Sequence, residues 1–248
     1  MKLDTSRHTD HQYDEFNDPE QRYRQRYVDL VVNSEVKETF IKRSKIISSI
    51  RRFLEKLNFV EVETPILQPI PGGAAAKPFV THHNSLNIPL YMRIANELYL
   101  KRLIVGGFDG VFEFAKDFRN EGMDRTHNPE FTNLEFYVAY KDYNWMMDLT
   151  EKLLENTVTE LYGKSDVVYG ANKIDFKGPY PRIPILEAIK NETGIDVENL
   201  NDNELSEKAK NIGIEVDSTM GRGKIIDSIF GDKCCLLYTS PSPRDLRK

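Results

Sequence analysis

Residues 111–138 read VFEFAKDFRNEGMDRTHNPEFTNLEFYV, and this stretch decides the fold. In its second half the residues alternate with a period of two, as in a strand with two different faces. Leu134, Phe136 and Val138 then form one face, which is typical of a core. The opposite face carries aromatic, amide and carboxylate side chains, an unusual set for a plain solvent face: Phe131, Asn133, Glu135 and Tyr137.

The first half of the stretch predicts the partner strand. The same period of two places Arg119 and Glu121 together, directly before a charged loop. If the two strands pair in the antiparallel sense, these side chains share a concave surface with Phe131, Glu135 and Tyr137. We therefore predict a hairpin that carries the chemistry on one face.

The composition is that of an ordinary globular protein with one substantial core, since 40% of the 248 residues are hydrophobic and 29% are charged. The net charge of -5 argues against non-specific nucleic-acid binding, which needs a basic surface. The two cysteines, Cys234 and Cys235, are adjacent, which favours a reducing compartment and offers no metal-ligand spacing. No membrane-spanning run or signal peptide is recognisable, so we expect a cytoplasmic protein that does not contact a membrane.

Two helices are expected before the first strand. Asp18 can cap the first, with Pro19 in its first turn and Gln21 closing a capping box, and this helix is expected to continue to about residue 32. Ser34 can cap the second, which covers residues 35–57 and ends at a left-handed Asn58. The second helix and the following VEVETP segment suit a dimer surface, and ordinary core packing explains their periodicity equally well.

The next expected features are a loop, a strand and a helix. In the loop PIPGGAAA, Gly72 and Gly73 allow a backbone to approach a ligand closely. Residues 90–95 are expected to form a strand, after which Asn96 can cap a helix over residues 97–105. Glu97 then lies in the first turn of that helix, where the helix dipole alone is enough to explain a carboxylate.

The chain divides into four predicted parts. Residues 1–17 are polar and aperiodic and are expected to be disordered, whereas residues 18–180 form the main core. That core includes a helix over residues 142–162 and a strand pair near residues 167–176. Three short helices are expected in a helical insertion at 181–234, with nothing catalytic among them. Residues 235–248 contain a match to a translated sequencing adapter and are expected to be foreign to the fold.

The residue types of the hairpin suit the formation of an acyl adenylate. The planar guanidinium of Arg119 can hold a carboxylate and a phosphate at once, Phe131 can stack on a purine, and Arg125 and His127 can reach distal phosphates. Such a reaction needs no enzyme nucleophile, and the sequence shows no nucleophile elbow, Walker loop or zinc motif. An Arg–Glu pair beside a Phe is also common in α/β proteins, so spacing alone leaves both interpretations open.

Resemblance favours the first interpretation. FRNEGMDRTHNPEFTNLEFY at 118–137 resembles motif 2 of the class II aminoacyl-tRNA synthetases, and FVEVETP at 59–65 resembles motif 1. Together with EVETPILQPIPGGAAAKPF and ELYLKRLIVGGF, these segments are similar to the lysyl-tRNA synthetases of subclass IIb over residues 20–234. The resemblance implies an α+β fold with a mixed, mainly antiparallel sheet flanked by helices and a small helical insertion. The related aspartyl and asparaginyl enzymes differ in the PGGAAAKPF loop.

The resemblance also implies the reaction and its site residues. A lysine-tRNA ligase activates L-lysine with ATP and transfers it to tRNA(Lys), in a homodimer that here would form through residues 35–57 and motif 1. Arg119 would bridge the lysine carboxylate and the α-phosphate. The adenosine would contact Glu121, Asn128 and Phe131, and His127 would contact a distal phosphate.

The same resemblance implies four residues that hold the amino acid. The Gly73 backbone and Glu97 would hold the α-amine, while Glu135 and Tyr137 would hold the side-chain ammonium. A buried carboxylate and phenol reject a ligand that leaves them unpaired, by several powers of ten.

Several features depart from the family pattern. Asn96 replaces a more usual proline, and FAKDFRNE replaces an INRNFRNE-like run; neither change is expected to touch a contact residue. No GxGxGxDR-like motif 3, no acidic ligands for Mg²⁺ and no anticodon-binding barrel are recognisable. We therefore expect an incomplete fold, inactive alone, with the metal ligands in a missing C-terminal part. The alternatives are a protein-lysine ligase of the same fold and a non-catalytic lysine-binding or dimerising module.

Overall fold

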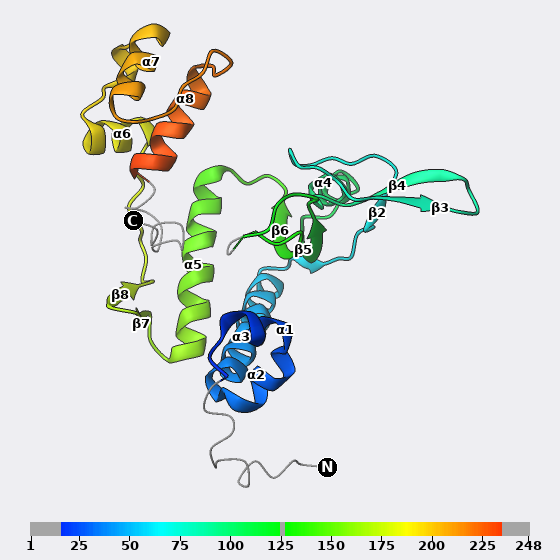
Figure 1. The fold of residues 1–248 in the computed structure, drawn as a ribbon. Coiled ribbons are helices and arrows are strands. Elements are labelled where there is room, and N and C mark those ends of the chain that lie inside the picture. Colours follow the sequence, from blue (N-terminus) through cyan, green and yellow to red (C-terminus); the bar gives the residue numbers. More distant parts are fainter. Residues whose placement is uncertain (1–15, 125–126, 235–248) are drawn as a thin grey trace, which may run out of the picture. The chain divides into compact units, whose positions relative to one another are not determined.

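The computed structural model describes residues 16–124 and 127–234, which form two compact units (Figure 1). Unit 1 contains the described residues up to 121 together with 130–179, and unit 2 contains those of 122–129 together with 180–234. The predictions for residues 1–15, for Arg125 and for the segment 235–248 fall outside the described residues. Within the described ranges, no helix is long and apolar enough to cross a membrane.

Unit 1 begins with three helices, α1 (Pro19–Arg24), α2 (Arg26–Val32) and α3 (Ser34–Lys56). Asp18 caps α1 as predicted, but it accepts the N–H of Glu20, whereas a capping box would need that of Gln21. The prediction of one helix up to residue 32 is wrong, because the helix is interrupted at Gln25. Asp29, which is fully buried, bonds side chains on both sides of this break and so stabilises it: Arg22, Arg26 and Asn33.

Helix α3 differs from its prediction at the start and agrees with it at the end. Asn33 occupies the capping position, and no side chain among the described residues caps the helix, so the cap predicted at Ser34 is wrong. Asn58 has a φ of 62°, which confirms the predicted left-handed stop. The apolar face of α3 buries Leu54 completely and packs along α5 (Tyr143–Tyr162). Asp142 caps α5 by accepting the N–H of Trp145.

The predicted hairpin is confirmed as part of a three-stranded sheet. Strand β5 (Gly110–Phe118) pairs antiparallel with β6 (Glu130–Val138), and β1 (Val60–Glu61) runs parallel to β5 on its other side. One face of this sheet packs on α3 and α5 through a cluster of buried apolar side chains: Leu54, Phe59, Phe112, Leu149 and Leu153. The α+β class with mainly antiparallel pairing is therefore confirmed.

A second sheet has the order β2 (Leu67–Gln68), β4 (Ile88–Met92), β3 (Val80–His83). The sequence predicts only one of its strands, and that strand begins earlier and ends earlier than residues 90–95. The sequence does not reveal β3 because all four of its residues are exposed, which removes the alternation that marks a half-buried strand. Helix α4 (Glu97–Val105) follows, with the bounds that the sequence predicts.

Unit 1 ends with the predicted strand pair, β7 (Asp166–Tyr169) and β8 (Asn172–Asp175). Unit 2 contains the three predicted helices, α6 (Ile185–Thr193), α7 (Asp202–Asn211) and α8 (Arg222–Ile229). Two shorter segments, η2 (Val197–Asn199) and η3 (Phe230–Cys234), complete the unit. Its helices enclose a separate apolar core that includes Ile189, Leu205 and Ile229, each fully buried.

Candidate functional site

The hairpin presents the predicted polar face on the side of the sheet opposite the core. The strand register pairs Asn133 with Ala115 and Glu135 with Glu113, so alternate residues of both strands meet on this side. We call it the site face. It is formed by Val111, Glu113, Ala115 and Asp117 of β5 and by Phe131, Asn133, Glu135 and Tyr137 of β6.

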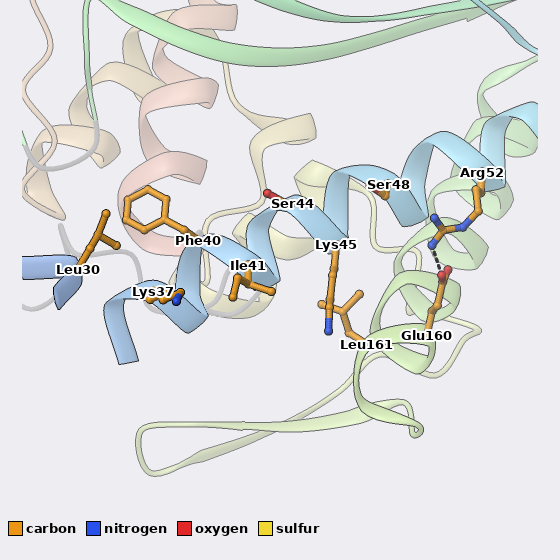
Figure 2. A pocket seen from close by; sticks show the side chains of 10 residues that line it. All are labelled: Leu30, Lys37, Phe40, Ile41, Ser44, Lys45, Ser48, Arg52, Glu160 and Leu161. Carbon is orange, nitrogen blue, oxygen red and sulfur yellow. Dashed lines mark hydrogen bonds and ion pairs between the residues drawn. The ribbon is translucent and has the colours of Figure 1, made fainter. Parts of the chain in front are cut away.

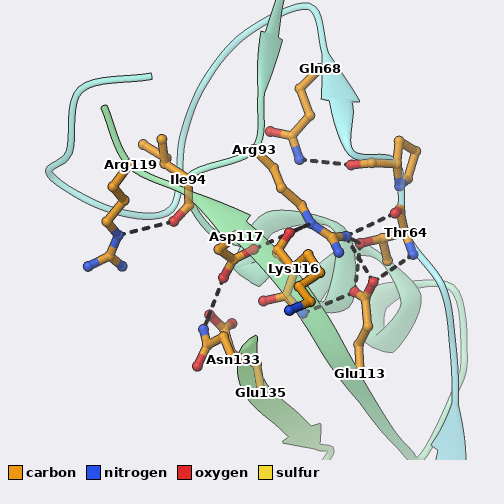
Figure 3. A network of polar contacts seen from close by, with 12 residues as sticks. Thr64, Gln68, Arg93, Ile94, Glu113, Lys116, Asp117, Arg119, Asn133 and Glu135 are labelled. Atoms are coloured by element: carbon orange, nitrogen blue, oxygen red, sulfur yellow. Dashed lines mark hydrogen bonds and ion pairs between the residues drawn. The ribbon is translucent and has the colours of Figure 1, made fainter. Parts of the chain in front are cut away.

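Arg119 follows β5 and lies against the start of β6. Its guanidinium carbon is 5.0 Å from the centre of the Phe131 ring, within the range of a cation–π contact. Its Nε donates to the carbonyl of Ile94 at 3.4 Å, and the terminal nitrogens point away from that bond (Figure 3). The structure thus brings together a fixed cation and a flat aromatic ring, as the sequence predicts.

Glu135 and Tyr137 are adjacent, as predicted, and are bonded to each other. The Tyr137 hydroxyl donates to Oε2 of Glu135 at 2.9 Å, and the Asn133 amide donates to Oε1 of Glu135 at 2.9 Å. Partial burial raises the pKa of Glu135, and the nearby charges of Asp117 and Glu97 raise it further. The two hydrogen bonds act in the opposite direction and lower it. Burial and the Glu135 charge likewise raise the pKa of the Tyr137 phenol, which therefore remains a donor at neutral pH.

The other two residues predicted for the amino acid also meet. Gly73 has a φ of +87°, and a Cβ placed on it would lie 3.1 Å from the Cβ of Ala95 and 3.3 Å from that of Glu97. The backbone at Gly73 is therefore in close contact with the first turn of α4, which only glycine allows. Glu97 bonds the ammonium of Lys101 at 2.5 Å, and that ammonium lies 5.8 Å from the centre of the Tyr137 ring.

A buried polar network lies beside the site face, and the strand patterns did not predict it. The Arg93 guanidinium donates to Glu113 at 2.8 Å and to the carbonyls of Thr64 and Lys116 at 2.9 and 2.8 Å (Figure 3). Its Nε also lies 3.3 Å from Oδ1 of Asp117. The signal was present in VFEFAKDF, because carboxylates in an otherwise apolar strand require partners when they are buried.

The two carboxylates of this network have opposite pKa shifts. Burial acts to raise the pKa of Glu113, but hydrogen bonds from Asn96 and Thr64 and the charge of Arg93 outweigh it and hold that pKa below its usual value. Burial raises the pKa of Asp117, and its bond from Asn133 does not fully compensate. Among the described residues, Oδ1 of Asp117 has no hydrogen-bond partner, although the positive charge of Arg93 lies nearby.

One prediction about this region needs correction. The Asn96 side chain does not cap α4; it donates to Oε2 of Glu113 at 3.0 Å, because the buried carboxylate needs a donor. One departure from the family pattern is also linked to the predicted contact residue Glu135 through a bridging amide. Asp117, which belongs to the FAKDFRNE run, accepts from the Asn133 amide, and that amide also donates to Glu135.

The remaining candidates lie on the segment after β5. Glu121 is exposed and accepts the N–H of Lys77 at 3.3 Å, while the N–H of Asn120 donates to the Lys77 carbonyl at 2.7 Å. His127 pairs with Asp124 through Nδ1 at 2.9 Å. His127 and the exposed Asn128 belong to unit 2 and are not assigned to the site face; Arg125 is outside the described residues.

Within residues 16–124 and 127–234, no group of three or more His, Cys, Asp or Glu side chains is arranged to hold a metal ion. The carboxylates of the site face already bond amides, a phenol and a guanidinium. This donor set suits the recognition of a cationic organic group. The described residues therefore do not fit a magnesium site.

Comparison with known proteins identifies the family. The family tRNA synthetases class II (D, K and N) matches residues 18–215. A lysine–tRNA ligase from Christiangramia forsetii is 64% identical over 230 residues, which cover 93% of this chain and 40% of that protein. Lysine–tRNA ligases from Porphyromonas gingivalis and Azobacteroides pseudotrichonymphae are 60% and 56% identical, again over 93% of this chain.

This chain spans 40% to 46% of the length of these relatives. The matched family segment contains the whole site face and both of the segments that resemble motifs 1 and 2. The chain belongs to the class II tRNA synthetases of the D, K and N type.

Proposed function

We propose that the protein containing this chain activates L-lysine with ATP and transfers the lysyl group to tRNA(Lys). The observation that supports this most directly is the arrangement of the site face, where Glu135 bonded to Tyr137 lies on the same strand as the Phe131 ring under Arg119. A cation-binding end and an anion-binding end are thus presented side by side. The names of the three similar proteins, lysine–tRNA ligases, agree with this chemistry.

At the cation-binding end, the lysine side chain is held by Glu135 and Tyr137. The Glu135 carboxylate accepts a hydrogen bond from the ε-ammonium, and the ring and hydroxyl of Tyr137 line the space that this ammonium occupies. Glu97 and the Gly73 backbone hold the α-amine. A neutral side chain leaves the partly buried Glu135 carboxylate without its cation, which is the physical basis of selectivity for lysine.

At the anion-binding end, Arg119 bridges the lysine carboxylate and the α-phosphate of ATP. A carboxylate oxygen attacks the α-phosphorus, a new O–P bond forms, and the bond to the β-phosphate oxygen breaks to release pyrophosphate. The guanidinium stabilises the negative charge that develops on the phosphoryl oxygens, so no side chain acts as a nucleophile. Phe131 stacks on adenine, and Glu121 and Asn128 contact the adenosine.

The distal phosphates are assigned to His127 and Arg125. In this family of reactions Mg²⁺ neutralises phosphate charge, and no group of three or more His, Cys, Asp or Glu side chains in residues 16–124 and 127–234 is arranged to hold it. The proposed contacts with lysine and with the α-phosphate use side chains of this chain and the Gly73 backbone.

We also propose that the protein is a homodimer through α3 and the segment that resembles motif 1. Support comes from exposed apolar side chains there, which include Phe40, Ile41 and Val60 at 45–48% exposure. Phe40 and Ile41 line a groove of about 780 Å³ between α2, α3 and α5, which the Arg52–Glu160 ion pair bounds at one end (Figure 2). Sedimentation of the whole protein tests this, and a monomer at micromolar concentration contradicts it.

We propose the same division of the chain that its sequence predicts. Residues 18–180 carry the site, residues 181–234 are a helical insertion, and residues 235–248 are foreign to the fold. The isolated chain is expected to bind lysine without supporting pyrophosphate exchange, because no GxGxGxDR-like motif 3 is recognisable in it. Lysine-dependent ATP–pyrophosphate exchange by the chain alone contradicts this expectation.

The substitution Glu135→Gln in the whole protein tests the main proposal. We expect the KM for lysine to rise about 100-fold or more, because the ammonium loses a charged partner, while the KM for ATP changes little. Glu130→Gln on the same strand is the matched control, since Glu130 is exposed and pairs loosely with Lys116 at 3.7 Å. Equal losses for lysine and ATP in Glu135→Gln show that Glu135 does not hold the ammonium.

A further inference from the structure

Asn133 lies at the centre of the site face. Its partner in the strand register is Ala115, a small and buried residue, which leaves room for the Asn133 amide to lie flat along the face. The amide nitrogen donates to Oδ2 of Asp117 at 3.1 Å and to Oε1 of Glu135 at 2.9 Å. A side-chain amide has two N–H hydrogens, so both are used, one for each carboxylate.

One of these two carboxylates is buried beside a cation. Asp117 is fully buried, and Oδ1 lies 3.3 Å from Nε of Arg93. Arg93 is itself only 3% exposed and is held by Glu113 and by the carbonyls of Thr64 and Lys116 (Figure 3). The buried network therefore fixes Asp117, and Asp117 fixes the orientation of the Asn133 amide.

The second carboxylate is held from both sides. Oε1 of Glu135 accepts from Asn133, and Oε2 accepts from the Tyr137 hydroxyl, both at 2.9 Å. Two donors on two different oxygens fix the plane of the carboxylate as well as its position. The remaining lone pairs of Glu135 are then oriented before a ligand arrives.

We propose that Asn133 is the positioning residue that fixes the Glu135 carboxylate for an ammonium ligand, with the buried Asp117 as its anchor. The inference rests on the proposed lysine site, and it assigns to Asn133 a share of the selectivity. Preorganisation of this kind raises affinity, because the side chain loses little further freedom when the ligand binds.

The surroundings of Glu135 explain why a donor is needed there. Glu97 of α4 and Asp117 of β5 are carboxylates that raise its pKa, and Glu113 is its direct neighbour across the strands. The nearby cations are committed elsewhere, since Arg93 pairs with Glu113 and Lys101 with Glu97. Without the Asn133 amide, the Glu135 carboxylate would take up a proton more readily and lose its preferred orientation.

The test uses Asn133→Leu and Asn133→Asp in the 248-residue chain. Both variants keep the approximate size of the side chain; leucine removes the donor, and aspartate replaces it with a further carboxyl group. We expect the dissociation constant for L-lysine, measured by calorimetry, to rise about tenfold, because a hydrogen bond to a charged group is lost. We also expect ¹³C NMR of the ligand-free chain to show that the Glu135 carboxyl titrates at a higher pH than in the unsubstituted protein.

Thr132→Val is the matched control, because Thr132 precedes Asn133 on the same strand and bonds Arg43 on the other face. It should leave both measurements unchanged. An unchanged Glu135 titration in both Asn133 variants overturns the positioning role, whatever the lysine affinity. A shifted titration in a chain that binds no lysine supports the positioning role and contradicts lysine binding by the isolated chain. The Glu135→Gln test in the whole protein then decides on the proposed function, so the two failures are distinguishable.

Discussion

At the scale of single residues, the partly buried charge of Glu135 on the site face lowers the stability of the folded chain. The raised pKa of Glu135 means that the folded chain holds this proton more tightly than the unfolded chain does. Stability therefore falls as the pH rises from the ordinary carboxyl range through the raised pKa, and the full cost is present above that pKa. Glu113 has the opposite effect on stability. Its lowered pKa contributes stability that is lost as the pH falls through that pKa.

The raised pKa of Glu135 leads to a prediction for Glu135→Gln in the isolated chain. The substitution removes the cost of the buried charge, so we expect a higher melting temperature at pH 7 and little change at pH 4, where the native carboxyl is largely protonated. A gain of about 1 kcal/mol corresponds to about 2–4 °C for a chain of this size. Calorimetry at the two pH values measures it, and a lower melting temperature at pH 7 contradicts the expected gain.

A second residue-scale prediction concerns Lys101. Its ammonium bonds Glu97, which is proposed to hold the α-amine of the ligand, and it lies over the Tyr137 ring. Because an incoming α-amine must displace Lys101, we expect Lys101→Gln to tighten lysine binding by about two- to threefold, the size of an exposed i,i+4 pair. Calorimetric titration with lysine measures this; a weaker affinity would show that Lys101 assists binding.

At the scale of elements, the end of α5 depends on one glycine. Gly163 has a φ of 72°, and a Cβ added there would meet no atom of the described residues, so the conformation alone sets the cost of a side chain. We expect Gly163→Ala to destabilise α5 by about 1–2 kcal/mol. Hydrogen exchange of the last turn of α5 measures the loss.

The matched control is Gly223→Ala, which has the same free space but lies inside α8. There Gly223 is the second residue of the helix and its φ is not positive, so the same change should stabilise the helix slightly, because alanine has the higher helix propensity. The same sign for both substitutions would contradict the role assigned to the backbone conformation.

Elements with strong periodicity were the ones the sequence predicted well. The hairpin, α4 and α5 have long amphipathic patterns and recognisable ends, so their bounds agree closely with the structure. Strand β3 has no such pattern, and the break at Gln25 depends on the ion pairs of Asp29, which form only in the fold. Local sequence does not encode either feature.

The residues of the site divide in the same way, into those that a strand pattern predicts and those that it does not. Glu135, Tyr137, Arg119 and Phe131 were recognisable because a period of two places them on one strand face or at its end. Asn96 and Asp117 were not assigned their contacts, since Asn96 bonds Glu113 on another element and Asp117 lies beside Arg93, which directly follows β4. The pattern of one strand cannot specify partners that are distant in the sequence.

At the scale of the whole molecule, each of the two units has a separate core. Leu205 is fully buried in unit 2 and has no role in the site face. We expect Leu205→Ala to destabilise unit 2 by about 2–5 kcal/mol while the lysine affinity of unit 1 stays the same. Hydrogen exchange of α6 and α8, measured beside lysine titration, tests this; a parallel loss of lysine binding would show that the units fold as one.

The buried network has a consequence for how the chain is assembled. All of its members, and those of the cation-binding end, lie between Thr64 and Tyr137 in one continuous run. The bonded groups are up to 49 residues apart in the sequence, as for Thr64 and Glu113, and because closure entropy grows only slowly with loop length, closing these loops adds little further cost. The charged groups of the site therefore all come from one continuous segment of the chain. The helices packed behind the sheet mainly support it.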